Sequence, residues 1–414
     1  MKTSTWRADG NFNRNHLTYH PPLCEGIMDY SFQDKGERQA LKLTCGRIVV
    51  KIGTQLLTDV KGQTPQQQIV ALLDVVAQLR ERGLEIVIVS SGAVGMGMRA
   101  MQVSRRPKSL DKLQAYAAIG QNHLMRCYVE AAEKHGFTCG QLLLTAADLH
   151  DLDRNRHVSQ CLDALLAAGV LPVINENDSV CTDEIKVGDN DTLAAYVATM
   201  CRASLTILLT TVDAMHELQD DSTLGERVSV VRELSAKVKA QAKGTDGNEF
   251  STGGMQTKLR AAEIVNRTGD YLVVAGGKEG FSVLLDILDG KDVGTVFVPR
   301  RQGHMHSRQR FLAFFAEPAG TLIIDSGAEK ALCQQNRSLL PGGVLGTRGV
   351  FHRGDTVRIV NAENKEIGRG IINFAHDEMA RICGVQSGKL AACLQREVHI
   401  PEVIHRDYMV LEEA

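Results

Sequence analysis

Short apolar runs alternate with helix-like segments along most of the chain. Arg47–Lys51 is a β-branched run, and apolar residues recur at helical spacing after Thr64 and Pro65, which suit an N-cap and a first helical position. Glu85–Val89 is a second β-branched run. Together these segments predict a β-α-β unit, and its right-handed crossover predicts a parallel sheet.

Further segments of the same two kinds continue this alternation to about residue 300. Strand followed by helix over some 260 residues is typical of an α/β fold, here an open, mostly parallel sheet sandwiched by helices. We expect further strands at Gln141–Leu144, Val170–Ile174, Leu205–Leu209, Tyr271–Val274 and Thr295–Val298, and helices around Leu110–Lys134, Arg154–Ala168 and Thr192–Met200.

The segments on either side of this α/β domain, residues 41–300, have a different character. Residues 1–40 are polar and aperiodic, so we interpret them as a flexible N-terminal extension without an assigned function. Residues 301–318 continue a basic, loop-like stretch that begins at Arg300 and are interpreted as a linker. Residues 319–405 are rich in strands and turns, which predicts a small, mostly-β domain, and residues 406–414 form a tail.

Composition narrows the class of protein. The 414 residues carry a formal net charge of −2, which requires neither a nucleic acid nor an anionic membrane as partner. No apolar run is long enough to span a bilayer, and the first forty residues lack a secretory signal, so we expect a cytoplasmic protein without a membrane partner. The ten cysteines form no CxxC pair or zinc-ligand set, which favours reduced thiols and no fixed metal site.

Two lysine-bearing segments suit an anionic ligand. Lys51 leaves a buried strand just before Gly53, so its ammonium group can enter a phosphate site, although this segment taken alone favours an edge lysine that merely caps a strand. Thr252–Lys258 (TGGMQTK) precedes a helix, and free helix-start amides, hydroxyls and a cation together favour binding of a phosphate.

Three other segments place small or acidic residues after predicted strands. Ser91 opens an SGA turn whose amides suit a carboxylate or phosphate, or simply form a tight turn. Asp178, with Glu176 nearby, suits the ammonium group of an amino acid or caps a helix. Asp189, Asn190 and Asp191 stand at a predicted helix start, and three such residues exceed what one N-cap requires.

These segments, in this order and spacing, resemble the glutamate 5-kinases of the amino-acid kinase family. The similarity runs from about Arg47 to the C-terminus and includes VVKIGT, SSGAVG, INEND, IKVGDND and STGGMQTK. The β-rich tail, with SLLPGGV, RGD and HRDYM, resembles a PUA module. The resemblance implies an amino-acid kinase domain over 41–300, a PUA-like domain over 319–405, and phosphorylation of the side-chain carboxylate of L-glutamate by ATP with Mg²⁺, the first step of proline synthesis.

The resemblance also implies roles for individual residues. Lys51 and Lys258 would flank the transferring phosphoryl group, and Asp189 and Asp191 would orient the lysines or assist Mg²⁺. Ser91, Asp178 and Asn190 would hold glutamate. The residues implied to bind the nucleotide are Lys51, Thr210, Thr211, Thr252, Gly253, Gly254, Met255, Gln256, Thr257 and Lys258.

One segment departs from the family pattern. After the strand LTILL the family reads Thr-Asp and then Val-Asp-Gly-Leu-Tyr, whereas this chain reads Thr-Thr-Val-Asp-Ala-Met-His over residues 210–216. An aspartate is replaced by Thr211, and the glycine and the tyrosine by Ala214 and His216. The departure concerns how the nucleotide is held and leaves the phosphoryl-transfer lysines untouched, so a kinase is still expected.

Alternatives remain at this point. The acceptor is expected to be glutamate, but acetylglutamate, aspartate and small phosphate acceptors are alternatives within the family. A regulatory or RNA-associated protein with a weakened kinase domain is the other class, although eleven Lys/Arg against twelve Asp/Glu from Ala319 to Ala414 do not favour RNA. The resemblance further implies proline as feedback inhibitor, a homo-oligomer, and a glutamyl-phosphate reductase as partner.

Overall fold

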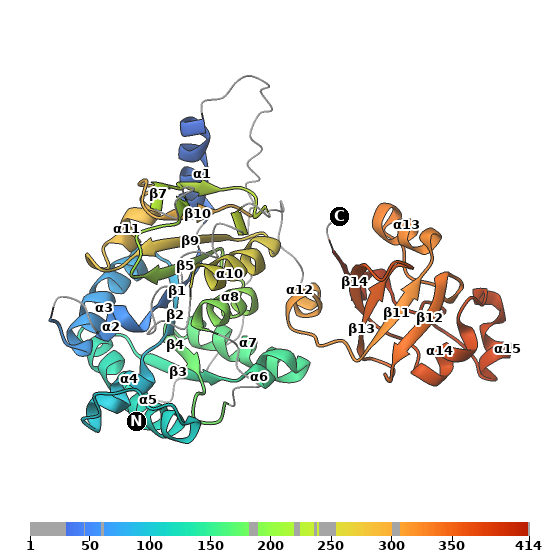
Figure 1. Cartoon of the computed structure of the whole chain (residues 1–414), viewed down its shortest axis with the longest axis horizontal. Helices are drawn as coiled ribbons and strands as arrows, with labels where there is room; N and C mark the ends of the chain where they lie inside the picture. The colour runs from blue at the N-terminus through green and yellow to red at the C-terminus, as the bar shows by residue number, and fades with distance from the viewer. Residues whose placement is uncertain are drawn as a thin grey trace, which may run out of the picture.

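The computed structural model describes residues 30–44, 46–58, 62–181, 189–218, 224–235, 238–239, 254–299 and 307–412. An eight-stranded sheet with helices on both faces forms the larger part, and a five-stranded sheet forms the C-terminal part (Figure 1). The predicted fold class is confirmed. In the described part of the chain no helix is long and apolar enough to cross a membrane.

The large sheet is parallel except where β9 meets β10. The strands β2, β3 and β4, which follow β1 in the chain, all lie on one side of β1 in the sheet, and the later strands β5, β9, β10 and β8 lie on the other side. The strand order therefore reverses between β1 and β5. Ligands of open α/β sheets bind beyond the carboxyl ends of the strands at such a point. In spatial order the strands are β3 (Cys139–Leu144), β4 (Leu171–Glu176), β2 (Glu85–Ser90), β1 (Arg47–Ile52), β5 (Leu205–Thr210), β9 (Tyr271–Gly276), β10 (Thr295–Phe297) and β8 (Val230–Val231).

Helices connect these strands where the periodicity predicts them. Helix α3 (Pro65–Glu81) begins with a capping box, in which the Thr64 hydroxyl accepts from the Gln67 amide and the Gln67 side chain accepts from the Thr64 amide. A separate hairpin pairs β6 (His216–Leu218) with β7 (Leu224–Arg227). The helices are α1 (Tyr30–Thr44), α2 (Thr54–Thr58), α3 (Pro65–Glu81), α4 (Ala93–Ala100), α5 (Leu110–Glu133), α6 (Ala146–His150), α7 (Leu152–Ala167), α8 (Asn190–Cys201), α10 (Met255–Arg267), α11 (Val283–Leu288) and α12 (Ser307–Phe314).

Each face of the large sheet has its own apolar core. Ile48, Val50 and Ile52 of β1 join the core on the α3 and α5 side, whereas Val49 joins the core that contains α8 and α10. This division follows from the alternation of side chains along a strand. Every residue of α8 from Asp191 to Cys201 is buried, as expected of a helix that is apolar all round. Helix α8 is thus the central element on its face.

The C-terminal part encloses a third core between its sheet and three helices. Its sheet includes β15, which lies beyond the boundary we expected at residue 405, because antiparallel pairing with β14 completes the sheet. The strands in spatial order are β12 (Val344–Gly349), β11 (Gly320–Ile324), β13 (Thr356–Val360), β14 (Glu366–Ile371) and β15 (Met409–Leu411); the helices are α13 (Ser326–Gln335), α14 (His376–Ile382) and α15 (Leu390–Leu394), with short 3₁₀ turns at Pro341–Gly343, Ser387–Lys389 and Arg406–Tyr408.

Two segments differ from the sequence-based expectation. Helix α1 begins within residues 1–40, which we interpreted as a flexible extension, and its Arg38 is buried. The linker, which we interpreted as loop-like, contains α12 (Figure 1), and this helix packs against both α8 and β15. Arg310 of α12 is buried and donates to the Thr199 carbonyl at 3.1 Å, so it satisfies a carbonyl in the last turn of α8. Distant partners of this kind leave no local sequence signal.

Candidate active site

Lys51 comes from the carboxyl end of β1 and lies on the α8 face of the sheet. It is two residues beyond Val49, so both side chains point to that face, and Lys51 is buried with only 8% of its surface exposed. The neighbouring Gly53 amide donates to the Leu209 carbonyl at 3.3 Å, which ties the end of β1 to the end of β5. The lysine is therefore fixed at the point where the strand order reverses.

Asp191, in the first turn of α8, is held between two lysines. Its Oδ1 lies 2.7 Å from Lys51 Nζ, and its Oδ2 lies 3.0 Å from Lys258 Nζ. The Thr257 hydroxyl donates to the same Oδ2 at 3.1 Å. Lys258 is buried in the first turn of α10, which packs against α8. Two residues some 200 positions apart in the chain thus converge on one carboxylate.

The electrostatics of this cluster favour an anion. Burial by itself would raise the pKa of Asp191, but the ammonium groups of Lys51 and Lys258 outweigh burial and lower the pKa to about 2. The carboxylate is therefore ionised at neutral pH. These two ammonium groups and one carboxylate together carry a net positive charge at the carboxyl edge of the sheet, which suits an anion such as a phosphoryl group.

The two residues before Asp191, Asp189 and Asn190, make different contacts at the start of α8. Asp189 is the N-cap, and its Oδ1 accepts from the Thr192 amide at 2.9 Å. Its Oδ2 is buried and has no hydrogen-bond partner among the described residues. Asn190 points away from the lysines and donates to the Ser91 hydroxyl at 2.6 Å and to the Ser90 carbonyl at 3.1 Å. One helix start therefore serves two neighbouring sub-sites.

A chain of buried polar groups continues from Asn190. The Asn190 amide also donates to Asn175 Oδ1 at 3.1 Å, and Asn175 in turn donates to Gln121 Oε1 at 2.9 Å. Beside them the Ser90 and Tyr128 hydroxyls lie 3.0 Å apart. Sequence reasoning missed Gln121 and Tyr128, because both stand within a regular helical pattern. A polar residue on the buried face of α5 is the signal that points to them.

Asp178, the third residue predicted to hold glutamate, lies in the turn after β4 and is half-buried. Glu176, at the end of β4, is buried and accepts a hydrogen bond from the Cys181 thiol at 3.5 Å. Since β4 is the neighbour of β2, the turn with Asp178 and the Ser91 turn leave the same edge of the sheet. The structure thus joins Ser91 to Asn190 directly and places Asp178 at their edge.

Comparison with known proteins matches this architecture domain by domain. The amino acid kinase family matches residues 46–276, more than half of the chain, and the PUA domain matches residues 320–394. The chain belongs to the amino acid kinase family. The resemblance seen in the sequence is thereby confirmed, and the lysine–aspartate–lysine cluster lies inside the matched region.

Several curated relatives are similar over nearly their full length. Glutamate 5-kinase of Geobacter sulfurreducens is 39% identical over 88% of this chain and 97% of its own length. Those of Thermoanaerobacter sp. and Thermus thermophilus are each 40% identical and span 89% and 90% of this chain and 98% of their own lengths. Carbamate kinase from Giardia lamblia bound to AMP-PNP is 18% identical over 62% of this chain and 99% of its own, with a TM-score of 0.45.

A close crossing of α4 and α5 fixes the turn that bears Ser91. A Cβ added to Gly120 would lie 1.7 Å from the Ala93 carbonyl oxygen, and one added to Gly97 would lie 1.9 Å from the Tyr116 carbonyl oxygen. Gly92, the N-cap of α4, has a φ of 101°, which favours glycine. The three glycines therefore set where the free amides of the first turn of α4 point in this amino acid kinase.

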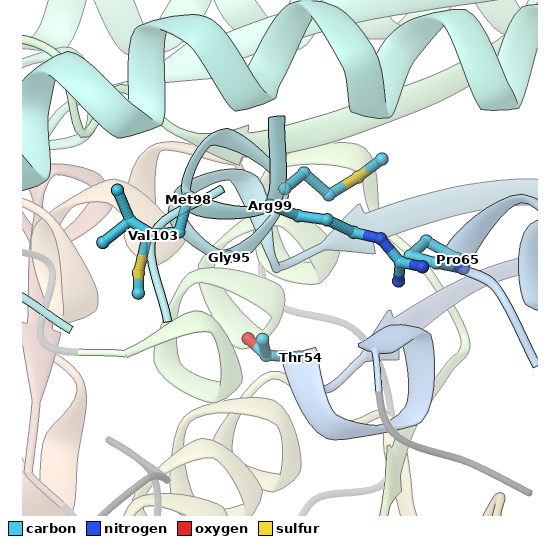
Figure 2. Close-up of a pocket in the computed structure, with 7 residues that line it drawn as sticks. Thr54, Pro65, Gly95, Met98, Arg99 and Val103 are labelled. Atoms are coloured by element: carbon cyan, nitrogen blue, oxygen red, sulfur yellow. The ribbon is translucent and has the colours of Figure 1, made fainter. Parts of the chain in front are cut away.

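A cavity of about 350 Å³ lies between α4 and the start of α2 and α3. Figure 2 shows Arg99 extending from α4 toward Pro65, while Thr54 faces the cavity from the first position of α2. Its volume falls in the range of small-ligand pockets. Thr54 follows Lys51 by three positions and Gly95 follows Ser91 by four, so the segments after these two residues contribute to its wall. It is lined by Thr54, Pro65, Gly95, Met96, Met98, Arg99 and Val103.

The loop that departs from the family pattern is held by its own contacts. Thr210 and Thr211 lie half-buried at the end of β5, whereas Ala214 and Met215 are 2% exposed. The Gly276 amide donates to the Asp213 carbonyl at 3.2 Å, and a Cβ on Gly276 would lie 2.9 Å from Asp213 Cα. The loop therefore closes tightly over the end of β9.

His216 occupies the position of the family tyrosine. Its Nδ1 lies 3.0 Å from the Gly225 carbonyl oxygen and its Nε2 lies 3.0 Å from Asp213 Oδ1. Both ring nitrogens face acceptors, so the protonated imidazole is favoured, and the Gly225 carbonyl and the Asp213 carboxylate raise the pKa of His216. Where the family has a tyrosine, this chain thus has a histidine that pairs with Asp213, and the charge of this pair depends on pH.

The remaining predicted nucleotide residues lie at the start of α10. Gly254 is the N-cap and its carbonyl accepts from the Thr257 hydroxyl at 2.8 Å. Met255 and Thr257 are half-buried and Gln256 is exposed in the first turn. Thr252 and Gly253 lie outside the described residues. The described part of the chain holds no cluster of three or more His, Cys, Asp or Glu side chains that suits a metal ion.

Proposed function

We propose that this protein is a glutamate 5-kinase, which transfers the γ-phosphoryl group of ATP to the side-chain carboxylate of L-glutamate. The product is L-glutamyl 5-phosphate, and the reaction is the first step of proline biosynthesis. The observation that carries the proposal is the Asp191 carboxylate held between Lys51 and Lys258, with Ser91 and Asn190 joined beside it. The full-length similarity to glutamate 5-kinases supports the choice of acceptor.

The main obstacle to this reaction is repulsion between two anions, the ATP phosphates and the glutamate carboxylate. A carboxylate oxygen of glutamate forms a bond to the γ-phosphorus, while the bond from the γ-phosphorus to the bridging oxygen breaks and ADP leaves with its electron pair. Lys51 and Lys258 offset the negative charge along this in-line path, and Asp191 fixes both ammonium groups. The step requires alignment rather than a nucleophile from the protein.

The acceptor half provides hydrogen bonds for glutamate. The Ser91 hydroxyl accepts from Asn190, so its own proton is directed to a ligand carboxylate. The first-turn amides of α4 add donors at the same place. Asp178 contributes negative charge for the ammonium group of the amino acid. Ser91, Asn190 and Asp178 are therefore proposed as the glutamate-binding residues.

The nucleotide half is proposed to consist of Thr210, Thr211 and the start of α10. Helix-start amides and Lys258 suit the phosphates of ATP. Mg²⁺ usually binds nucleotides through one or two protein carboxylates together with the phosphates. The buried Asp189 Oδ2, without a hydrogen-bond partner in the described residues, fits one such ligand, and Mg²⁺ supplies charge neutralisation when bound.

The resemblance to glutamate 5-kinases supports proposals about inhibition, assembly, a partner enzyme and cellular location. We propose inhibition by proline, a homo-oligomeric assembly, and transfer of the labile product to a glutamyl-phosphate reductase, all in the cytoplasm. Each follows from the similarity to glutamate 5-kinases rather than from a contact in this chain.

An acceptor panel tests the proposed function. The protein is incubated with ATP, Mg²⁺ and one of glutamate, N-acetylglutamate, aspartate or uridine monophosphate, with hydroxylamine present to trap an acyl phosphate. We expect ADP release and hydroxamate formation with glutamate, reduced by added proline. Turnover with uridine monophosphate and none with glutamate would show that the acceptor is wrong, and turnover with none of the four would overturn the assignment as a kinase.

A further inference from the structure

A buried arginine of α1 binds the segments that precede β8 and β10. Helix α1 precedes residues 46–276, which the amino acid kinase family matches, and it contributes none of the predicted site residues. Arg38 nevertheless has only 4% of its surface exposed. A charged side chain is rarely buried to this extent unless it is fully paired, so its contacts indicate a specific task.

The guanidinium of Arg38 joins two segments far from it in the chain. Its Nη1 donates to the Lys291 and Val293 carbonyls at 3.1 and 2.9 Å, and its Nη2 donates to the Gly294 and Ser229 carbonyls at 3.3 and 3.1 Å. These residues lie just before β10 and between β7 and β8. A rigid, planar group with several donors fixes such carbonyls relative to one another, which a lysine cannot do equally.

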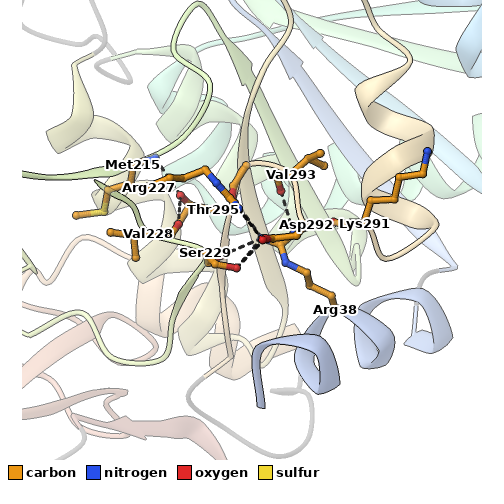
Figure 3. A network of polar contacts seen from close by, with 10 residues as sticks. Arg38, Met215, Arg227, Val228, Ser229, Lys291, Asp292, Val293 and Thr295 are labelled. Atoms are coloured by element: carbon orange, nitrogen blue, oxygen red, sulfur yellow. Dashed lines mark hydrogen bonds and ion pairs between the residues drawn. The ribbon is translucent and has the colours of Figure 1, made fainter. Parts of the chain in front are cut away.

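Asp292 connects Arg38 to the β6–β7 hairpin. Its Oδ1 lies 2.9 Å from Arg38 Nη2, and its Oδ2 lies 2.7 Å from Arg227 Nη2 (Figure 3). Arg227, the last residue of β7, also donates to the Gly294 carbonyl at 2.7 Å. Hydrogen bonding to Arg227 and Ser229 and the charge of Arg38 lower the pKa of Asp292, so its carboxylate stays ionised between the two guanidinium groups.

One further residue, Thr295, connects this network to the loop of residues 211–216, whose sequence differs from the family pattern. The Thr295 hydroxyl donates to the Val228 carbonyl at 2.6 Å and accepts from the Met215 amide at 2.9 Å. His216, the next residue, pairs with Arg227 across the hairpin. Figure 3 shows the side chains of this network close together: Arg38 from α1, Asp292 from just before β10, Thr295 from the start of β10, and Arg227 from the hairpin, with Met215 beside them. The loop of residues 211–216 is thus bonded to Thr295, the residue that follows Gly294, whose carbonyl accepts from both Arg38 and Arg227.

We propose that Arg38 is a positioning residue for nucleotide binding, through which α1 holds the β6–β7 hairpin and the loop of residues 211–216 in place. The inference rests on the proposed function, in which this loop borders ATP. Residues Thr211, Ala214 and His216 depart from the family pattern here, and α1 supplies support from outside the region that the family matches. Among the described residues the acceptor half makes no contact with this network, so we expect Arg38 to leave binding of its ligand unchanged.

The test separates the two substrates. In the full chain Arg38→Gln keeps the stem and removes the guanidinium, and we expect the KM for ATP to rise about five- to tenfold while the KM for glutamate stays within about twofold. Asp292→Asn gives the same split, and the double variant is no worse than the poorer single variant, because both changes break one network. Arg82→Gln, which breaks the exposed pair with Asp289 at 2.9 Å, is the matched control and leaves both KM values unchanged.

Equal changes in both KM values, or a lower melting temperature with both unchanged, would overturn the proposal and make Arg38 a purely structural contact. Calorimetric titration with Mg-ATP alone keeps this test independent of the acceptor. Weaker Mg-ATP binding by Arg38→Gln than by the unmodified chain supports the role even if glutamate proves to be the wrong acceptor. Absence of Mg-ATP binding by the unmodified chain overturns it.

Discussion

The two halves of the proposed active site are held in different ways. The acceptor half rests on a helix crossing that only glycine permits and on a buried chain of hydrogen bonds from Ser91 to Gln121. The nucleotide half rests on a loop whose Asp213 side chain is 72% exposed and whose support comes from Thr295 and from α1. The acceptor half is therefore fixed from within, whereas the nucleotide half depends on neighbouring elements.

The largest effect is expected where the halves meet. Lys258→Ala removes one of the two ammonium groups that we propose face the transferring phosphoryl group, so kcat should fall by roughly 10²–10³-fold, as for the loss of one charge-stabilising donor. The KM for glutamate should change little, because Ser91 and Asn190 remain. Steady-state kinetics with hydroxylamine trapping measures both, and Arg260→Ala, an exposed change two residues along α10, is the control. Near-normal turnover would remove Lys258 from the mechanism.

The next largest effect is expected from a substitution at the crossing of α4 and α5, which should disturb the acceptor half alone. Gly120→Ala places a methyl group 1.7 Å from the Ala93 carbonyl oxygen, so α4 must move away from α5. We expect a loss of roughly 1–3 kcal/mol in the free energy of unfolding, as for other overpacked sites, measured by urea denaturation. The KM for glutamate should rise more than the KM for ATP.

Gly46→Ala is the control for that crossing, since a Cβ there meets no atom within 4 Å. If both KM values of Gly120→Ala rose equally, the crossing would not be specific to the acceptor half.

The sequence reveals the charged members of the site better than their supports. Lys51 stands out because it ends a β-branched run just before a glycine, and Asp191 stands out because the helix start carries more polar residues than one N-cap requires. Gln121 and Tyr128 stand inside a regular helical pattern, and Arg38 is 253 or more positions from most of its partners. Local periodicity predicts strands and helices, but it carries no information about contacts at such separation.

The charge cluster between the halves predicts a dependence of stability on pH. The pKa of Asp191 is lowered to about 2 in the folded chain, below the ordinary value near 4 of an unfolded aspartate. Its contribution, about 2 kcal/mol, is therefore present above about pH 4 and is lost as the pH falls toward 2. Urea denaturation between pH 5 and pH 2.5 should show this loss in the unmodified chain and a smaller loss in Asp191→Asn. Parallel curves for the two proteins would contradict the assignment.

The smallest expected effect concerns the departing loop and tests whether the nucleotide half responds to pH. The pKa of His216 is raised, first by the Gly225 carbonyl and then by Asp213, so the imidazolium and its pair with Asp213 are fully present below about pH 6.5 and are lost as the pH rises through the folded pKa. Because Asp213, the partner of His216 in this pair, has a side chain that is 72% exposed, solvent screens the pair, and we expect the KM for ATP to rise by only about two- to threefold between pH 6 and pH 8.5. The KM for glutamate should stay unchanged over the same pH range.

His216→Tyr, which restores the family residue, should remove the pH dependence of the KM for ATP. An unchanged pH dependence in that variant would assign the titration to another group.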